Sequence, residues 1–210
     1  MEKEILLTPE ALYYLGSLLQ AKYIDYAYVA ALGDIKQNYA LFEKETRASL
    51  VSQGILTEDF SGNLEIDPTA LALLKPVFFG EIETAISICT TGERSAVSLC
   101  MFHFHDGVIT SVITRNGHLS LRNVDRLSIR KQVEALVPLG YQAQDGTVAQ
   151  VNPDSVNRMI AVKCMVAGAG TVVKTFVEAD GMLYHQLEDR LESISAEAFI
   201  TIVYSIVKGG

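Results

Sequence analysis

Hydrophobic residues recur at helical spacing in three stretches of the first 80 residues. The first stretch follows Thr8, which can cap a helix, and it has Pro9 in its first turn. The second runs from about residue 35 to Gln53 and ends at Gly54, because glycine favours helix C-termini. The third follows Asp67, again with a proline in the first turn. The pattern therefore predicts an N-terminal helical region.

Two segments between these helices have a different pattern. Residues 55–66 predict two short strands around a Ser-Gly-Asn turn, whereas residues 22–32 fit a helix and a strand equally well. A helix, a glycine and a two-stranded wing also form the end of a winged-helix DNA-binding domain. The helix concerned carries Glu43, Lys44, Glu45 and nearby Arg47 and is close to neutral, whereas DNA binding requires positive charge. A structural hairpin is the preferred interpretation, and a winged-helix regulator is the alternative.

From Glu81 the hydrophobic period changes from that of helices to that of strands. Two hairpin signals, Asp106-Gly107 and Asn116-Gly117, separate runs rich in β-branched and aromatic residues. The expected strands are 81–89, 95–105, 107–115 and 118–124, followed by a helix from about 125 to 137. The same order then recurs, with a hairpin signal at Asp180-Gly181. Its expected strands are 146–151, 157–168, 171–179 and 182–189, and its helix spans 195–207.

The two blocks match when the sequence is shifted by 64 positions. Between residues 94 and 127 the shift gives 9 identities in 34 positions without a gap, more than average composition would give. The last three identities are Asp-Arg-Leu at 125–127 and 189–191, where Asp125 and Asp189 are expected to cap helices. We interpret this match as an internal duplication of a β-meander and helix.

The expected fold class follows from the duplication. One meander exposes the whole apolar face of its sheet, and two can bury these faces under their helices around a pseudo-twofold axis. We expect an α+β fold with a mainly antiparallel sheet and an N-terminal helical subdomain. The expected parts are the helical region with its wing-like hairpin at 1–80, the first meander at 81–140 and the second at 141–210, within one compact domain.

Composition narrows the class of protein. The chain has 210 residues, of which 49% are hydrophobic, and a formal net charge of −8, which argues against a general nucleic-acid binder. Its three cysteines are odd in number and form no CxxC, so we expect reduced, buried thiols. We find no signal-peptide core and no apolar run of membrane-spanning length, and we expect a cytoplasmic protein with no membrane partner.

Candidate catalytic and metal-binding residues are few. His103 and His105 occupy one face of a strand, as a metal pair could, but His118 and His185 are expected elsewhere and supply no third ligand. There is no GxSxG, Walker or GxGxxG motif, and the two Asp-Arg pairs fit helix caps better than catalysis. We therefore expect no cofactor, no metal and no enzyme activity. An enzyme that uses His103, His105 or the Asp-Arg pairs is the alternative.

Apolar and aromatic positions are the remaining candidates for function. Two adjacent phenylalanines lie between a helix and a strand, the run "CMFHFH" is aromatic on both strand faces, and the last helix is apolar almost all round. The expected partner-binding residues are Phe78, Phe79, Phe102, His103, Phe104, His105, Arg115, Asn116, Phe199 and Tyr204.

Three stretches resemble the EspG family of type VII secretion proteins. They are "LTPEALYYLGSLL", "LVSQGILTEDFSGNLEIDPTALALLKPV" and the following "EIETAISI". The resemblance implies an α+β fold with a quasi-twofold sheet, and a cytosolic chaperone that binds a helical PE/PPE pair from its own locus. The chain looks shorter than mycobacterial members, so a shortened Gram-positive relative with a WXG100-like or LXG-like substrate is a further expectation. A homodimer is an open alternative.

Overall fold

The structure is a computed structural model that describes residues 4–30, 32, 38–91, 97–115, 117–137, 140–143, 147–148 and 151–208. The chain folds as two compact units, and each is described by itself. The first unit comprises residues 1–80 and 103–123, and the second comprises residues 81–102 and 124–210. The division falls within one strand, between Phe102 and His103. None of the helices described combines the length and the apolar character required to cross a bilayer.

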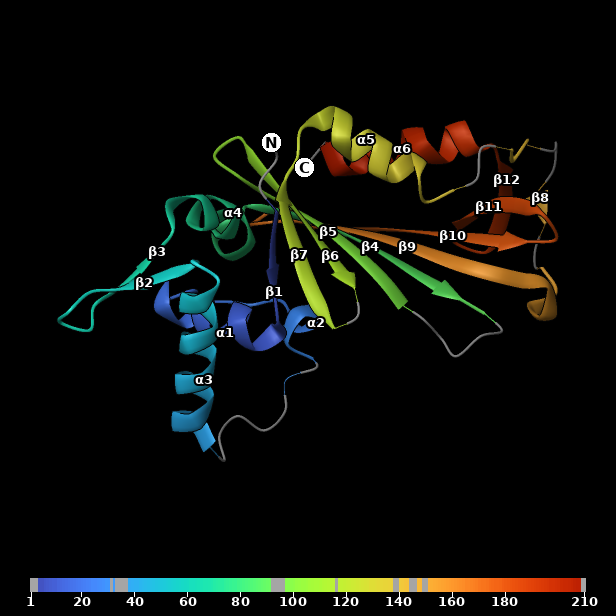
Figure 1. Cartoon of the computed structure of the whole chain (residues 1–210). Helices are drawn as coiled ribbons and strands as arrows, with labels where there is room; N and C mark the ends of the chain where they lie inside the picture. The colour runs from blue at the N-terminus through green and yellow to red at the C-terminus, as the bar shows by residue number, and fades with distance from the viewer. Residues whose placement is uncertain are drawn as a thin grey trace. The chain divides into compact units, whose positions relative to one another are not determined.

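The first unit contains helices, a small hairpin and three strands of the large sheet (Figure 1). Thr8 accepts a hydrogen bond from the Ala11 amide at 3.2 Å, and Asp67 accepts from two amides of the first turn of its helix, as the sequence predicts. Its elements are β1 (Glu4–Leu7), α1 (Pro9–Leu18), α2 (Tyr26–Val29), α3 (Tyr39–Ser52), β2 (Leu56–Glu58), β3 (Leu64–Ile66), α4 (Pro68–Phe79), β6 (Val108–Arg115) and β7 (His118–Asn123).

Strand β1 is an element that the sequence analysis missed. It pairs antiparallel with β7, and β7 pairs antiparallel with β6. Ile5 and Leu7 are buried on one face, whereas Leu6 is 52% exposed on the other. Glu4 accepts hydrogen bonds from Ser120 and, at 2.8 Å, from Arg122 of the paired strand. The short alternation at the start of the chain is thus an edge strand.

Close packing holds α4 against the strands of the first unit. The Thr110 hydroxyl of β6 donates to the Leu73 carbonyl of α4 at 3.0 Å, and Leu73 itself is buried. At the end of α4, a Cβ on Gly80 would lie 2.4 Å from the Pro76 oxygen and 3.0 Å from the Phe104 oxygen. The two backbones therefore approach each other too closely for any side chain at position 80.

The second unit is an antiparallel sheet with two helices on one face (Figure 1). Strand β5 (Val97–His105) contributes its first part to this unit. The other elements are β4 (Ile82–Thr90), α5 (Arg126–Glu134), β8 (Thr147–Val148), a 3-10 turn η2 (Pro153–Ser155), β9 (Val156–Val166), β10 (Gly170–Ala179), β11 (Met182–Leu187), β12 (Arg190–Ile194) and α6 (Ala196–Lys208). The α+β class with a mainly antiparallel sheet is therefore confirmed.

The core of the second unit lies between its sheet and its helices. Phe176 of β10 meets Phe199 of α6 edge-on, with ring centroids 4.8 Å apart, and both side chains are fully buried. Beside them, Arg158 of β9 pairs with Glu178 of β10 and donates a hydrogen bond to the Leu136 carbonyl at 3.0 Å. Arg158 thus ties the segment that follows α5 to the sheet.

The end of the second meander differs from the sequence prediction. Asp125 caps α5 by accepting a hydrogen bond from the Ser128 amide at 2.7 Å, as expected. Asp189, its counterpart after the shift of 64 positions, lies in the turn between β11 and β12 and caps no helix, so that prediction is wrong. The extra strand β12 has a physical reason, because it buries Leu191 in a cluster with Val177 and Tyr184.

The registers of the two hairpins agree. Asp180 and Gly181 both have positive φ, of 53° and 72°, which is the type I′ geometry expected for a two-residue hairpin. In the β6–β7 hairpin Val112 faces Leu121, and in the β10–β11 hairpin Phe176 faces His185. The shift of 64 positions carries each paired residue from Ser111 to Arg115 onto a pair of the second hairpin, as the interpretation of a duplication requires.

The matched register leads to a prediction about His185. Its ring stacks on Phe176 at 5.0 Å, and its buried Nε2 has no hydrogen-bond partner within the described structure, whereas the equivalent residue, Leu121, is fully buried and apolar. We expect His185→Leu to raise the free energy of unfolding by roughly 1–3 kcal/mol, because it removes an unsatisfied buried polar atom. Urea denaturation at neutral pH measures the change.

The pH dependence of stability tests the same account of His185, and the reverse substitution in the first hairpin is its control. Burial, followed by the charge of Lys174, lowers the pKa of His185, so the wild type loses stability as pH falls below the unfolded-state pKa of histidine. The gain from His185→Leu should therefore grow as the pH falls. The reverse change in the first hairpin, Leu121→His, should destabilise. A His185→Leu protein less stable than wild type at every pH would contradict this account.

Candidate functional site

One face of the sheet in the second unit lacks a helical cover. Phe176 contacts α6, so Phe176 and its paired residue Ile160 point to the helical side. Alternate residues on a strand point to opposite faces, so the neighbours of Phe176 and Ile160 lie on the other side of the sheet. No helix of this unit, among the residues described, lies on that side (Figure 1). We call this side the open face.

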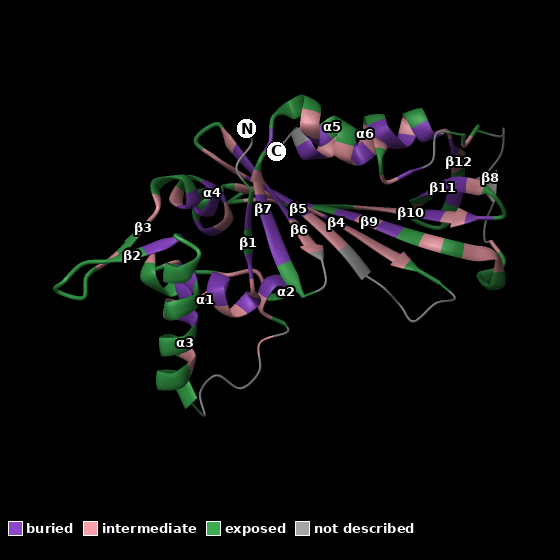
Figure 2. Ribbon diagram, in the orientation of Figure 1, coloured by how far each residue is buried: buried purple, intermediate pink, exposed green. Residues whose placement is uncertain are grey.

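The open face is apolar and adaptable. Met159 and Val173 are 44% and 56% exposed, and Met165 is half-buried. Lys163 lies between Ala85 and Val173 in register and is exposed. The face comprises Ala85, Ser87 and Cys89 of β4, Met159, Ala161, Lys163 and Met165 of β9, and Val173 and Thr175 of β10. Figure 2 shows the partly exposed positions that recur along β4 and β9. Methionine side chains adapt to different partner shapes, so the face suits an apolar partner.

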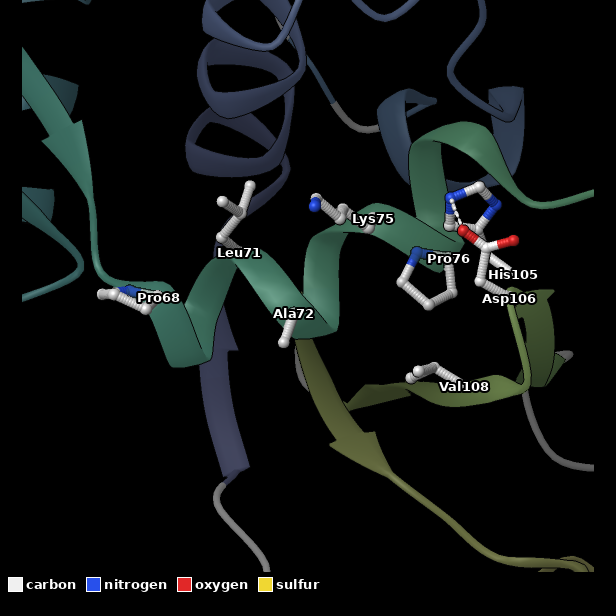
Figure 3. Close-up of a pocket in the computed structure, with 8 residues that line it drawn as sticks. All are labelled: Pro68, Leu71, Ala72, Lys75, Pro76, His105, Asp106 and Val108. Atoms are coloured by element: carbon white, nitrogen blue, oxygen red, sulfur yellow. Dashed lines mark ion pairs between the residues drawn. The ribbon is translucent and has the colours of Figure 1, made fainter.

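A groove of about 290 Å³ lies on the first unit, between α4 and the turn that joins β5 to β6 (Figure 3). Its lining residues are Pro68, Leu71, Ala72, Lys75 and Pro76 of α4 together with His105, Asp106 and Val108. The His105 ring and the Asp106 carboxylate point toward each other, with Nε2 and Oδ2 3.5 Å apart. The groove is therefore apolar along its floor and polar at one end.

The expected partner-binding residues are spread over both units. Phe102 and Phe199 are fully buried in the second unit, where Tyr204 is half-buried. In the first unit Phe78 and His103 are buried, Phe104 and His105 are half-buried, and Phe79 is 40% exposed with its ring edge-on to Phe78. Arg115 ends β6, and Asn116 lies outside the described residues. Of these ten residues, only His105 lines the groove on the first unit, and none lies on the open face.

His103 belongs to the core of the first unit. Its Nε2 lies 2.5 Å from the Tyr28 hydroxyl, and both residues are almost fully buried. Burial lowers the pKa of His103 to about 4, and the nearby charge of Asp25 opposes this shift only partly. The ring is therefore neutral at physiological pH and holds the short helix α2, which contains Tyr28, against β5.

The sequence analysis missed the open face, and it left residues 22–32, which contain α2, open between a helix and a strand. In residues 157–168 only Asn157, Arg158 and Lys163 are polar, so the hydrophobic pattern shows no regular alternation. The repeat predicted the strand here, and it does not say which face the helices cover. Two of the three cysteines contact other parts of the second unit. Cys164 is buried on the helical side of β9, and Cys100 lies 3.7 Å from the Gln132 side chain.

Comparison with known proteins gives a fold but no sequence family. No protein-family sequence model matches the chain, and no curated protein sequence matches it. A solved structure of the type VII secretion system chaperone EspG5 from Mycobacterium tuberculosis, in complex with the PE25–PPE41 dimer, is similar, with a TM-score of 0.63 and 12% identity. The match covers 98% of this chain and 95% of the EspG5 chain.

The fold is therefore EspG-like, as the sequence resemblance implied. At 12% identity this similarity shows the fold alone. Because the match covers 95% of the EspG5 chain, this comparison gives no support to the expectation of a shortened relative.

We predict that His103 contributes to acid sensitivity. The neutral ring is favoured in the folded state, so stability is complete above a pH of about 6.5 and declines as the pH falls toward 4. The loss from this residue approaches about 3 kcal/mol. His103→Phe should remove this part of the pH dependence in urea denaturation between pH 7 and pH 4.5, although it also loses the Tyr28 hydrogen bond. Equal pH dependence in both proteins would contradict the assignment.

Proposed function

We propose that this protein is a non-enzymatic cytoplasmic chaperone that binds helical substrates of a type VII secretion system and keeps them competent for export. The observation that carries the proposal is the similarity in fold to EspG5 over 98% of the chain. The substrate-bound state of that neighbour supports a helical protein as the partner. The acidic net charge of −8 also argues against a nucleic-acid partner.

We infer that the open face is the main contact with the substrate. Apolar side chains on a sheet lose unfavourable contact with water when a helix covers them. Met159 and Val173 lie at exposed positions of this kind, and the methionines let one surface fit helices of different shape. Lys163, at the centre, would pair with a carboxylate of the bound helix and fix its register.

The partner-binding residues expected from the sequence do not form the open face, and they have other roles in this proposal. Phe102 and Phe199 act by supporting the sheet, because their side chains are fully buried. Phe79, Phe104, His105 and Tyr204 retain access to solvent and remain candidates for secondary contacts. The substrate class is a PE/PPE pair or a WXG100-like or LXG-like protein from the same locus.

Co-expression tests the proposal directly. The tagged chain is co-expressed with each small helical protein of its gene neighbourhood, and the purified material is analysed for a stoichiometric complex. We expect one of them to co-purify. Val173→Glu should reduce the amount of bound substrate at least about tenfold, because it replaces an exposed apolar residue of the open face with a charged one. The new carboxylate faces Lys163 across the strands, so the sheet itself should tolerate it.

Leu127→Glu is the matched control. Leu127 is 60% exposed on α5, away from the open face, so this variant changes an exposed leucine to the same charged residue. It should bind substrate as the wild type does. If no helical protein from the locus forms a complex, the chaperone proposal fails. If a complex forms and both variants bind normally, the assignment to the open face fails.

A further inference from the structure

The hairpin β2–β3 presents an aromatic residue to solvent. Phe60 lies in the turn of this hairpin and is fully exposed. Burial of a phenylalanine side chain is more favourable in free energy than that of most residues, so its exposure is unusual. The turn is ordered: Asp59 accepts hydrogen bonds from the Ser61 and Asn63 amides at 2.8 and 2.9 Å. Arg47 of α3 donates to Glu58, the last residue of β2 before the turn, at 3.1 Å. The ring therefore stands on a rigid support.

The groove between α4 and the β5–β6 turn has the size and lining to accept such a ring. Its volume is about 290 Å³, whereas an apolar cavity of about 150 Å³ already holds benzene. Leu71, Ala72, Pro76 and Val108 supply apolar contacts. Lys75 places an ammonium group at the wall of the groove (Figure 3). The groove thus combines an apolar floor with a cation.

The charges around Phe60 are opposite in sign to Lys75. Asp59 directly precedes the ring and Glu65 is exposed on β3, whereas Glu58 at the end of β2 is paired with Arg47. Asp59 is ionised at neutral pH, since the hydrogen bonds from Asn63 lower the pKa of its carboxyl. An acidic aromatic knob and an apolar groove with a cation therefore occur in the same unit.

The connection between the two features favours a second copy of this chain as the occupant. Strand β3 ends at Ile66 and α4 begins at Pro68, so a single residue joins the hairpin that carries Phe60 to the helix that lines the groove. A knob and a groove on the same unit allow two copies to meet about a twofold axis, and each copy then gives its knob and receives that of the other. A contact that closes on itself also stops at the dimer.

We propose that the protein forms a twofold dimer in which Phe60 of each copy enters the groove between α4 and the β5–β6 turn of the other. The acidic residues of the hairpin lie next to Lys75 in this arrangement. The interface is small, so the dimer forms in the micromolar range. The open face of the second unit takes no part, and substrate binding is therefore a separate property.

Sedimentation velocity over the micromolar range tests the dimer with the full chain. We expect concentration-dependent dimerisation of the wild type. Phe60→Ser should raise the dissociation constant at least about tenfold, because it removes a buried aromatic ring from each half of the interface. Ala72→Gln should have a similar effect from the other side. Ala72 is exposed on a helix, so glutamine narrows the groove without disturbing the fold.

Leu127→Ser is the matched control, because it removes an exposed leucine from α5, and it should dimerise as the wild type does. Circular dichroism verifies that each variant is folded. A wild type that stays monomeric throughout the range overturns the proposal, and so does a dimer that neither Phe60→Ser nor Ala72→Gln weakens. Loss of substrate binding in Phe60→Ser, with no wild-type dimer, would assign Phe60 to the substrate interface instead.

Discussion

An antiparallel sheet has two faces, and the helices described in the second unit cover one of them. The contact between Phe176 and Phe199 decides which face that is, since it places α6 over the even-numbered positions of β10. Every side chain on the other face of β4, β9 and β10 then points away from the helical core. The surface proposed for substrate binding is thus a consequence of how the core is packed.

In the first unit, close backbone packing and a short hairpin decide which side chains are buried. Gly80 lets the backbone at the end of α4 approach that of Phe104, and the Thr110 hydrogen bond fixes the middle of the helix. The β2–β3 hairpin has only three residues in each strand, too few to bury the residue in its turn. The hairpin therefore holds Phe60 outside the core. The position of this aromatic residue follows from the length of the hairpin.

Local chemistry made much of this fold predictable. Thr8, Asp67 and Asp125 cap helices where the sequence indicates, and Asp180-Gly181 forms the expected turn, because each of these features depends on a few neighbouring residues. Strand β1 was missed because its partner β7 lies more than a hundred residues away, as the pairing of Glu4 with Arg122 shows.

The end of the repeat shows the limit of local signals. At 125–127 the sequence Asp-Arg-Leu caps and begins a helix. At 189–191 the same three residues form the end of a turn and the start of a strand. Leu127 is 60% exposed on its helix, whereas Leu191 is buried against Val177 and Tyr184. The burial of Leu191 against residues distant in the sequence favours the strand, so the three identical residues alone could not predict it. The open face was beyond prediction for the same reason, since only tertiary packing decides which face of the sheet the helices cover.

Strand β9 links the two sides of its sheet within two consecutive residues. Arg158 points to the helical side, where it pairs with Glu178 and holds the Leu136 carbonyl, while Met159 emerges on the open face. The two side chains share one stretch of backbone, so any twist imposed on the strand moves them together. A helix bound across Met159 would therefore lie one residue along the strand from the side chain that holds the segment after α5.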